Sequence, residues 1–271
     1  TLRGNFTYTA NMVKTWEEAF QKYAYQERAG KPYNYYVGYI ALGLFRDEDD
    51  VKYSPDQSSI AGREVLPGDI KYKDVNGDGV ITSDDQVPLS YQANYPRLMY
   101  GFGAEFRWKN LTLGVLFKGT GNVENYYVNP GNGGSGYLPF AMGVTGNVLS
   151  ITTDQSNRWT PREISGTAAT ENPNARFPRL SYGNDHNSLP QSTFWKTNAR
   201  YLRLQEISLT YNLKSLGWLN NVGISSVDLQ LVGYNLCVWD KVKTVDPEQA
   251  GKNGNVYPIP ARYAIQMYVN F

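Results

Sequence analysis

The chain has little of several residue types on which disulfide scaffolds and metal centres depend. Its 271 residues include one cysteine, Cys237, and one histidine, His186. One cysteine excludes an internal disulfide, and one histidine excludes a histidine metal cluster. The 26 basic and 25 acidic residues leave a net charge of +1, which gives no sign of a nucleic-acid partner. We expect Cys237 to be a small core residue and His186 to lie in an exposed loop.

Long hydrophobic runs are missing as well. No stretch approaches the roughly 20 apolar residues of a membrane helix, so a helical membrane protein is excluded. Aromatic residues with a polar group are plentiful: 22 Tyr and 6 Trp stand against 10 Phe. Such residues gather where a β-barrel meets lipid headgroups, but a large soluble β-protein can also be rich in tyrosine. Composition alone leaves both classes open.

Residues 261–271 alternate between apolar and polar side chains. One face carries Tyr263, Ile265, Met267, Val269 and Phe271, and the other carries Arg262, Ala264, Gln266, Tyr268 and Asn270. Side chains of a strand alternate with period two, so one face suits hydrocarbon and the other suits water. The segment also has about the 9–11 residues that a tilted transmembrane strand needs. This pattern predicts a strand of an outer-membrane barrel.

Five more segments repeat the alternation, which gives six predicted strands. They cover residues 2–10, 98–108, 111–117, 207–213, 227–231 and 261–271. The pair Lys109 and Asn110 predicts a tight turn between the second and third strands. The fold class that we predict is all-β: the C-terminal strands of a large antiparallel transmembrane β-barrel.

The connections between these strands differ in length in an ordered way. Residues 108–110 and 214–223 are short connections, whereas 14–96, 119–199 and 239–260 are long. Outer-membrane barrels alternate short periplasmic turns with long extracellular loops. Six strands are fewer than the roughly eight of the smallest such barrel. The chain also starts directly in a strand, without Met or a signal peptide, so we expect the remaining strands upstream.

The first long connection also contains a helical spacing. Trp16, Ala19, Phe20 and Tyr23 recur as on one face of a helix, with acidic residues near its start and basic residues later. We predict a short helix here that packs over the loop, with a membrane-surface helix as the alternative.

Residues 74–85 have the spacing of a twelve-residue calcium loop. The predicted ligands are Asp74, Asn76 and Asp78, the Val80 carbonyl, and Asp85 at position twelve. Gly79 permits the sharp turn, and Thr82 could bind directly or through water. Oxygen ligands at this spacing suit Ca²⁺ better than a transition metal. Asx- and Gly-rich turns also form without an ion. We expect a structural Ca²⁺ that holds an exposed loop.

No catalytic constellation emerges, and we predict that the chain is not an enzyme. The carboxylates, including Glu124 and Asp154, are scattered, so a glycosidase pair has little support. Residues 131–136 are glycine-rich but lack the Lys-Ser/Thr of a phosphate loop. Two other classes stay open: a secreted calcium-stabilised glycan-binding module and a surface hydrolase. The apolar face of the last strand argues against both.

An ordered set of motifs resembles one protein family. Residues 67–81 are similar to the hallmark loop of SusC/RagA-type TonB-dependent outer-membrane transporters. They are followed, in the order of that family, by similar segments at 95–102, 177–181, 199–204, 207–211, 233–236 and 246–248. The resemblance covers nearly the whole chain.

The resemblance implies a plugged barrel of about 22 strands in the bacterial outer membrane. Such transporters import oligosaccharides or peptides together with a SusD-type surface lipoprotein that closes over the extracellular loops, and TonB supplies the energy through the N-terminal part. By this resemblance, residues 1–271 are the C-terminal part of the barrel, and their partners are the rest of the barrel and plug, the lipoprotein, TonB and outer-membrane lipid. Loops 14–96 and 119–199 would face lid and substrate, and Tyr126, Tyr127 and Tyr137 would pack loop against loop or stack on sugars.

Overall fold

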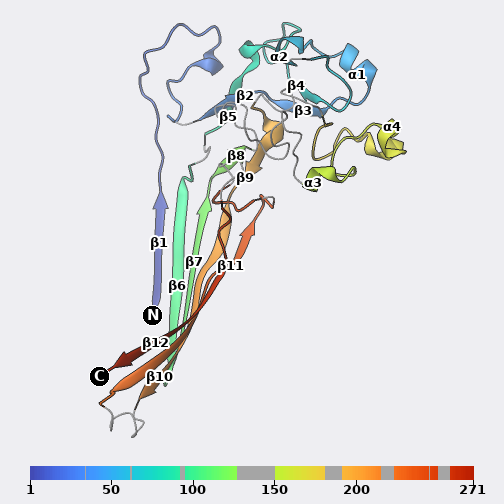
Figure 1. Cartoon of the computed structure of the whole chain (residues 1–271). Coiled ribbons are helices and arrows are strands. Elements are labelled where there is room, and N and C mark those ends of the chain that lie inside the picture. The colour runs from blue at the N-terminus through green and yellow to red at the C-terminus, as the bar shows by residue number, and fades with distance from the viewer. Residues whose placement is uncertain are drawn as a thin grey trace.

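A long antiparallel sheet with a cap of short elements at one end makes up the computed structural model (Figure 1). The structure describes residues 1–33, 35–61, 63–91, 95–126, 150–180, 191–214, 223–243, 245–249 and 257–271. The sheet has six strands in the order β1 (Leu2–Tyr8), β6 (Leu98–Trp108), β7 (Leu111–Gly121), β10 (Tyr201–Lys214), β11 (Ser226–Asp240) and β12 (Arg262–Asn270). All six predicted strands are confirmed. Among the described residues, no helix has the length and apolar character to cross a membrane.

The register of the sheet brings the apolar faces of its strands together. Phe102 of β6 pairs with Phe117 of β7, which pairs in turn with Leu204 of β10. The Phe102 and Phe117 rings stack with centroids 5.0 Å apart. Because directly paired residues of an antiparallel sheet point to the same side, one side is apolar across all six strands. On β12 this side is bare: Ile265 is 81% exposed.

The opposite side of the sheet is polar. Lys118 pairs with Arg203, Thr112 pairs with Thr210, and Gln230 pairs with Gln266. The two sides therefore differ in chemistry along the whole sheet, as the alternation in sequence predicted. Cys237 pairs with Leu204 and is half-buried on the apolar side of β11. The prediction that it is a core residue is wrong, since the side chain is only half-buried on this face of the sheet.

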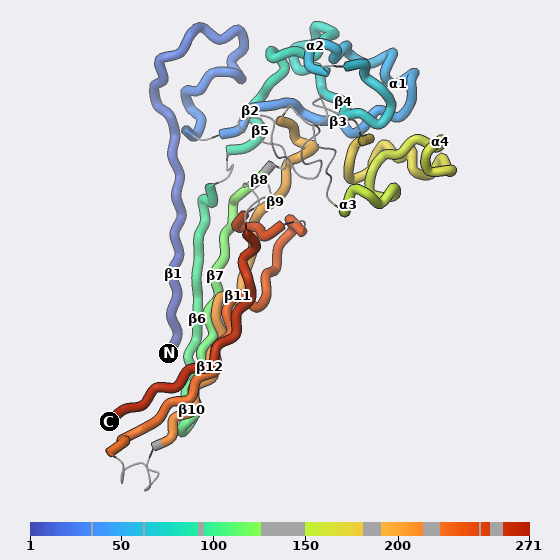
Figure 2. The backbone as a smooth tube through the Cα atoms, viewed as in Figure 1, coloured from blue at the N-terminus to red at the C-terminus, as the bar shows by residue number. Residues whose placement is uncertain are grey.

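The cap is built from the long connections, in which the sequence predicted only a short helix and a calcium loop. Short strands pair there as β2 (Tyr36–Gly38) with β5 (Val87–Ser90), β3 (Ala41–Leu44) with β4 (Ile70–Tyr72), and β8 (Glu124–Tyr126) with β9 (Lys196–Asn198). The helices are α1 (Glu48–Lys52), α2 (Ser58–Ala61), α3 (Ser150–Thr153) and α4 (Arg162–Ser165), with 3₁₀ turns at Ala24–Gln26, Ser83–Asp85, Ala168–Thr170 and Thr193–Trp195. The tube in Figure 2 shows these elements gathered beyond one end of the sheet.

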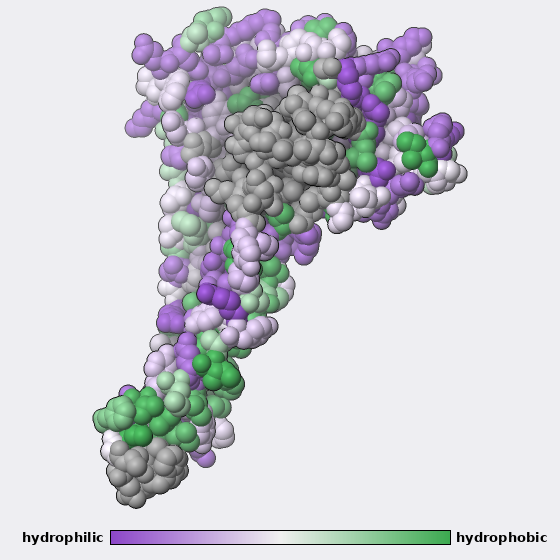
Figure 3. All heavy atoms as spheres, in the orientation of Figure 1, coloured by the Kyte–Doolittle hydropathy of each residue, from purple (hydrophilic) through white to green (hydrophobic). Residues whose placement is uncertain are grey.

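The cap has a hydrophobic core of its own, to which distant parts of the chain contribute. Its buried residues are Tyr39, Leu44, Ile70, Tyr72, Ile81, Trp159, Ala175, Phe177 and Trp195. Burial of each large apolar side chain stabilises this assembly by about 1.5–3 kcal/mol. Figure 3 shows the resulting contrast: hydrophilic residues dominate the visible surface of the cap, and a hydrophobic patch lies at the far end of the sheet.

The predicted helix around Trp16 and Tyr23 is wrong. The structure has no regular element over residues 9–23, and only a 3₁₀ turn follows at Ala24–Gln26. Phe20, which would lie on the apolar face of that helix, is 95% exposed. A helix this short is unstable without tertiary packing. The aromatic residues instead contact one another locally, as Tyr23 stacks on Tyr25 with ring centroids 5.1 Å apart.

Gly68 allows a close approach within the cap, and we expect its replacement by alanine to be costly. Its φ is +84°, and a Cβ atom there would lie 2.3 Å from the indole ring of Trp159. Gly68→Ala should destabilise the cap by about 1–3 kcal/mol, because both backbone strain and overpacking arise. Gly77→Ala is the matched control, since Gly77 has φ +79° but no atom within 4 Å of the added Cβ. Equal proteolysis rates of the two variant caps would contradict this reading.

Candidate functional site

The loop at residues 74–85 forms a tight turn that carries most of the predicted calcium ligands. Asp74 accepts hydrogen bonds from the backbone N–H groups of Gly77, at 2.6 Å, and Gly79, at 2.8 Å. Asn76 Oδ1 accepts from Asp78 N at 3.0 Å, and Asp78 Oδ1 accepts from Val80 N at 3.1 Å. Gly79 has φ +87°, as the sharp turn at position six requires. The turn therefore brings Asp74, Asn76 and Asp78 together.

Asp85, the predicted ligand at position twelve, is fully buried and faces the backbone. Its Oδ1 accepts from Val75 N at 2.7 Å, and its Oδ2 accepts from Thr82 N at 2.8 Å. Thr82 in turn accepts from Asp84 N, so Asp85 and Thr82 form a capping box around the 3₁₀ turn. These bonds close the loop without an ion. Among the described residues, no group of three or more His, Cys, Asp or Glu side chains is placed to hold a metal.

The carboxylate of Asp74 stays ionised at neutral pH. The N–H group of Gly79 donates to it and is the largest cause that holds the pKa of Asp74 below its ordinary value; burial opposes this, and the N–H group of Gly77 lowers the pKa further. Lys22 and Tyr25 attach the first connection to this loop, through Asp84 Oδ2 at 2.7 Å and the Asp84 carbonyl at 2.6 Å. The loop therefore links the segment that contains Lys22 and Tyr25 to the rest of the cap. The sequence motif could not show these contacts.

A buried carboxylate joins two connections of the cap. Asp69 is 0% exposed; Arg63 donates to it through Nη1 at 2.9 Å and Nη2 at 2.7 Å, and Arg179 donates through Nε at 2.7 Å. The backbone N–H of Leu66 adds a further bond at 2.8 Å. Asp69 and Arg179 are 110 residues apart in sequence. Asp69 lies in the hallmark segment 67–81. Its role in linking two connections of the cap was not predicted, because no local sequence pattern reports a contact over this separation.

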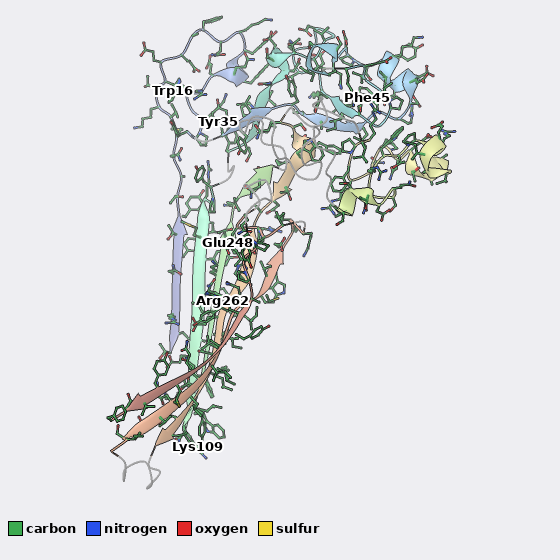
Figure 4. All side chains as sticks on the ribbon, viewed as in Figure 1. Trp16, Tyr35, Phe45, Lys109, Glu248 and Arg262 are labelled. Atoms are coloured by element: carbon green, nitrogen blue, oxygen red, sulfur yellow. The ribbon has the colours of Figure 1, made fainter. Side chains whose placement is uncertain are left out.

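A second ion cluster lies on the polar side of the sheet, near its cap end. Arg203 of β10 is 2% exposed and donates to Asp246 Oδ1 at 2.7 Å and Oδ2 at 2.5 Å. Its Nε lies 2.8 Å from Glu248 Oε1, and Lys118 of β7 contacts Glu248 Oε2 at 2.9 Å. Figure 4 shows Glu248 beside the cap end of the strands and Lys109 at the opposite end. The cluster attaches segment 245–249 to the polar face, which a barrel turns inward.

Some residues named in the sequence analysis lie outside the described residues. They are Tyr127, Tyr137, His186, the glycine-rich segment 131–136 and the side chain of Tyr126. The two carboxylates considered for a glycosidase pair have separate partners: Glu124 contacts Lys196 at 3.2 Å, and Asp154 accepts from Ser156. Neither arrangement supports a hydrolase.

Comparison with known proteins gives a consistent result. No family model matches the chain. It is 28% identical over 255 residues to TonB-dependent receptor P26 of Formosa agariphila. The alignment covers 87% of this chain and 22% of the relative. It is 23% identical over 230 residues to TonB-dependent receptor P3 of the same organism, with 84% and 20% covered. The chain thus spans about a fifth of the length of these relatives.

Solved structures agree on the fold. The RagAB peptide transporter matches with a TM-score of 0.60 and 21% identity, over 98% of this chain and 25% of the other. The RagAB peptide importer in the 'closed-closed' state matches with a TM-score of 0.60 and 20% identity, over 100% and 27%. These relatives are named receptors and transporters, not enzymes. The resemblance is therefore confirmed: the chain is an outer-membrane protein with the sheet of a transmembrane β-barrel, and it resembles the SusC/RagA-type TonB-dependent transporters in sequence and in fold.

Proposed function

We propose that residues 1–271 form the C-terminal strands and several surface loops of a TonB-dependent transporter that imports oligosaccharides or peptides. A SusD-type surface lipoprotein would close over the cap, and TonB would act through the plug and the rest of the barrel. The observation that carries this proposal is the six-stranded sheet with one apolar and one polar side. A strand set between lipid and a polar interior needs both sides at once, and on β12 the apolar side is exposed instead of being packed in a core.

The position of the cap supports the proposed orientation. β6 starts and β7 ends at the cap, as do the start of β10 and the end of β11, whereas the short turn at Lys109 and Asn110 lies at the other end (Figures 1 and 4). Long connections of outer-membrane barrels face the cell exterior. The cap would therefore meet both substrate and lipoprotein. A secreted glycan-binding module is less consistent with the structure, because the whole apolar side would stand in water.

A pull-down from outer membranes tests this proposal. A peptide tag is inserted at exposed Gly30, in the first connection, and the protein is purified in mild detergent. We expect this chain within a much larger barrel polypeptide or complex, together with a surface lipoprotein. A detergent-independent species near 30.5 kDa without a partner would refute the proposal and favour the soluble module.

We also propose that the loop at 74–85 binds a structural Ca²⁺. The ligands would be Asp74, Asn76, Asp78 and the Val80 carbonyl, with Asp85 at position twelve. The oxygen donors and the ionised Asp74 support this, although Asp85 serves the backbone. We expect an affinity in the 10⁻⁴–10⁻³ M range of extracellular modules. At about 100 times the Kd, Ca²⁺ would stabilise the loop by about 2.7 kcal/mol. Calcium, but not magnesium, should slow proteolysis within residues 74–85 of the intact protein.

The control for this prediction separates ion binding from loop folding. Asp78→Asn keeps a side-chain oxygen for the Val80 N–H but removes a charge from the proposed ion site. It should abolish protection by Ca²⁺ and leave cleavage without calcium nearly unchanged. Asp49→Asn in exposed α1 should retain full protection. If calcium protects none of the three proteins, the loop is held by its hydrogen bonds alone.

A further inference from the structure

The apolar side of the sheet is hollowed near the cap. A groove of about 510 Å³ lies where β6 starts, β7 and β11 end, and β10 starts. Leu98, Tyr100, Leu202 and Trp239 are its large apolar side chains, and Trp239 is 50% exposed. These residues belong to the same side of the sheet as Phe102 and Phe117. The groove therefore opens on the face that a barrel turns to lipid.

The floor of the groove is fixed. A Cβ atom at Gly119 would lie 2.6 Å from the ring and hydroxyl of Tyr100, so the absence of a side chain lets this ring approach β7 closely. The Tyr100 hydroxyl also donates to the Tyr201 carbonyl of β10 at 3.2 Å. Tyr100 thus bridges three strands. The groove beside Tyr100 is therefore bordered by strands that these contacts hold in place.

Two cations line the groove at its cap end. Arg200 and Lys241 are both exposed, and among the residues that the structure describes neither side chain has an ion pair or a hydrogen bond assigned to it. One carboxylate, Asp240, also borders the groove, but it accepts a hydrogen bond from Lys243 N at 3.0 Å. Two cations against one carboxylate give the cap end of the groove a net positive charge, next to its apolar part. Arginine and lysine in this setting bind phosphate groups.

The height of the groove in the membrane follows from the proposed orientation, on which this inference rests. The strand ends that border it continue into the cap, so they lie at the outer surface of the membrane. Trp and Tyr at that height are typical of the membrane–water interface. A ligand that fits this groove has an acyl chain for its apolar part and a phosphate for the two cations.

We propose that this groove binds one phosphorylated lipid of the outer leaflet, with an acyl chain against Leu98, Tyr100 and Trp239 and its phosphate between Arg200 and Lys241. The lipid would hold the cap end of β7, β10 and β11 at a fixed depth. An anionic lipid is favoured over a neutral one because both cations lie at the headgroup end of the groove.

Native mass spectrometry of the intact detergent-purified protein tests this. Delipidated protein is titrated with purified phosphorylated outer-leaflet glycolipid, with the same glycolipid after phosphatase treatment, and with inorganic phosphate. The double variant Arg200→Gln, Lys241→Gln should bind the phosphorylated lipid about twenty-fivefold more weakly, since each cation near an anionic headgroup contributes about fivefold. The control is Arg107→Gln, Lys109→Gln, which removes two exposed cations from the opposite end of the sheet.

Each comparison in this titration has a distinct outcome. The inference is supported if wild type and control bind the phosphorylated lipid alike while the double variant is weakened. It is overturned if the dephosphorylated lipid binds wild type equally well, if inorganic phosphate at about 1 mM competes fully, or if the double variant binds like wild type. The comparison of the two lipids on wild type needs no variant, so a folding defect cannot obscure it. Recovery of the large barrel and lipoprotein in the same preparation tests the proposed function separately.

Discussion

Replacement of Asp69 by Asn is expected to destabilise the cap by about 3–5 kcal/mol, the cost of breaking a buried ion pair by removing one charge. The carboxylate is 0% exposed and receives Arg63 and Arg179 from two different connections. Without its charge, two guanidinium groups in a partly buried site would face a neutral amide. Local opening of the cap should therefore become far more frequent.

Hydrogen exchange on the intact protein in membranes measures this opening directly. The reporter amides are those of Phe45, which donates to the Asp69 carbonyl, and Gly68, which donates to the Phe45 carbonyl. Both should lose protection in Asp69→Asn. Asp49→Asn makes the same charge change at an exposed position of α1 and should cost less than about 1 kcal/mol. Equal protection in the two variants would show that the ion cluster does not hold the cap together.

A charge on the apolar side of β12 should have the second large effect. We expect Ile265→Arg to destabilise the folded barrel by about 2–4 kcal/mol, as arginine does near the bilayer midplane on a lipid-facing position. Ile265 is the fourth of the nine residues of β12, near its middle, and is 81% exposed on the face shared with Leu231. Its environment in the membrane would be hydrocarbon, which cannot solvate a guanidinium group.

Gln266→Arg is the matched comparison, one residue away on the opposite side. Gln266 pairs with Gln230 on the polar side of the sheet. An arginine there would face the barrel interior and should cost little. Denaturant unfolding of the intact protein in lipid vesicles gives both values. A reversed order, with Gln266→Arg the more harmful, would mean that the two sides of the sheet have been assigned the wrong way round.

The sheet was predictable from sequence because its two environments differ so strongly. Lipid on one side and a polar interior on the other impose a period of two that local residues alone reveal, as at 263–271. The strand lengths were less predictable. β10 and β11 extend to Tyr201 and Asp240, well beyond the alternating stretches, through a bulge between Leu204 and Glu206. A bulge shifts the alternation by one residue and hides the strand from a period-two search.

The cap was largely unpredictable for the opposite reason. Its core and its ion clusters join residues that are far apart in sequence, such as Asp69 with Arg179 and Arg203 with Asp246. No local pattern reports such contacts. One element of the cap does have a local signal in the sequence: Asp47 caps α1, and three acidic residues occupy its first turn. The region 16–23 has helical spacing, but Phe20 in it is 95% exposed, and spacing without burial does not stabilise a helix.

Spin-label accessibility along β12 tests the central claim most directly, namely that this sheet spans the outer membrane with its apolar side in lipid. Single cysteines are placed at each position from 263 to 270 of the intact protein in membranes, after Cys237→Ser, and collisions with oxygen and with a water-soluble nickel chelate are measured. We predict that oxygen accessibility peaks at 263, 265, 267 and 269, while the chelate reaches the labels between them. High chelate accessibility at 265 and 267 would contradict the account, because those positions would then lie in water.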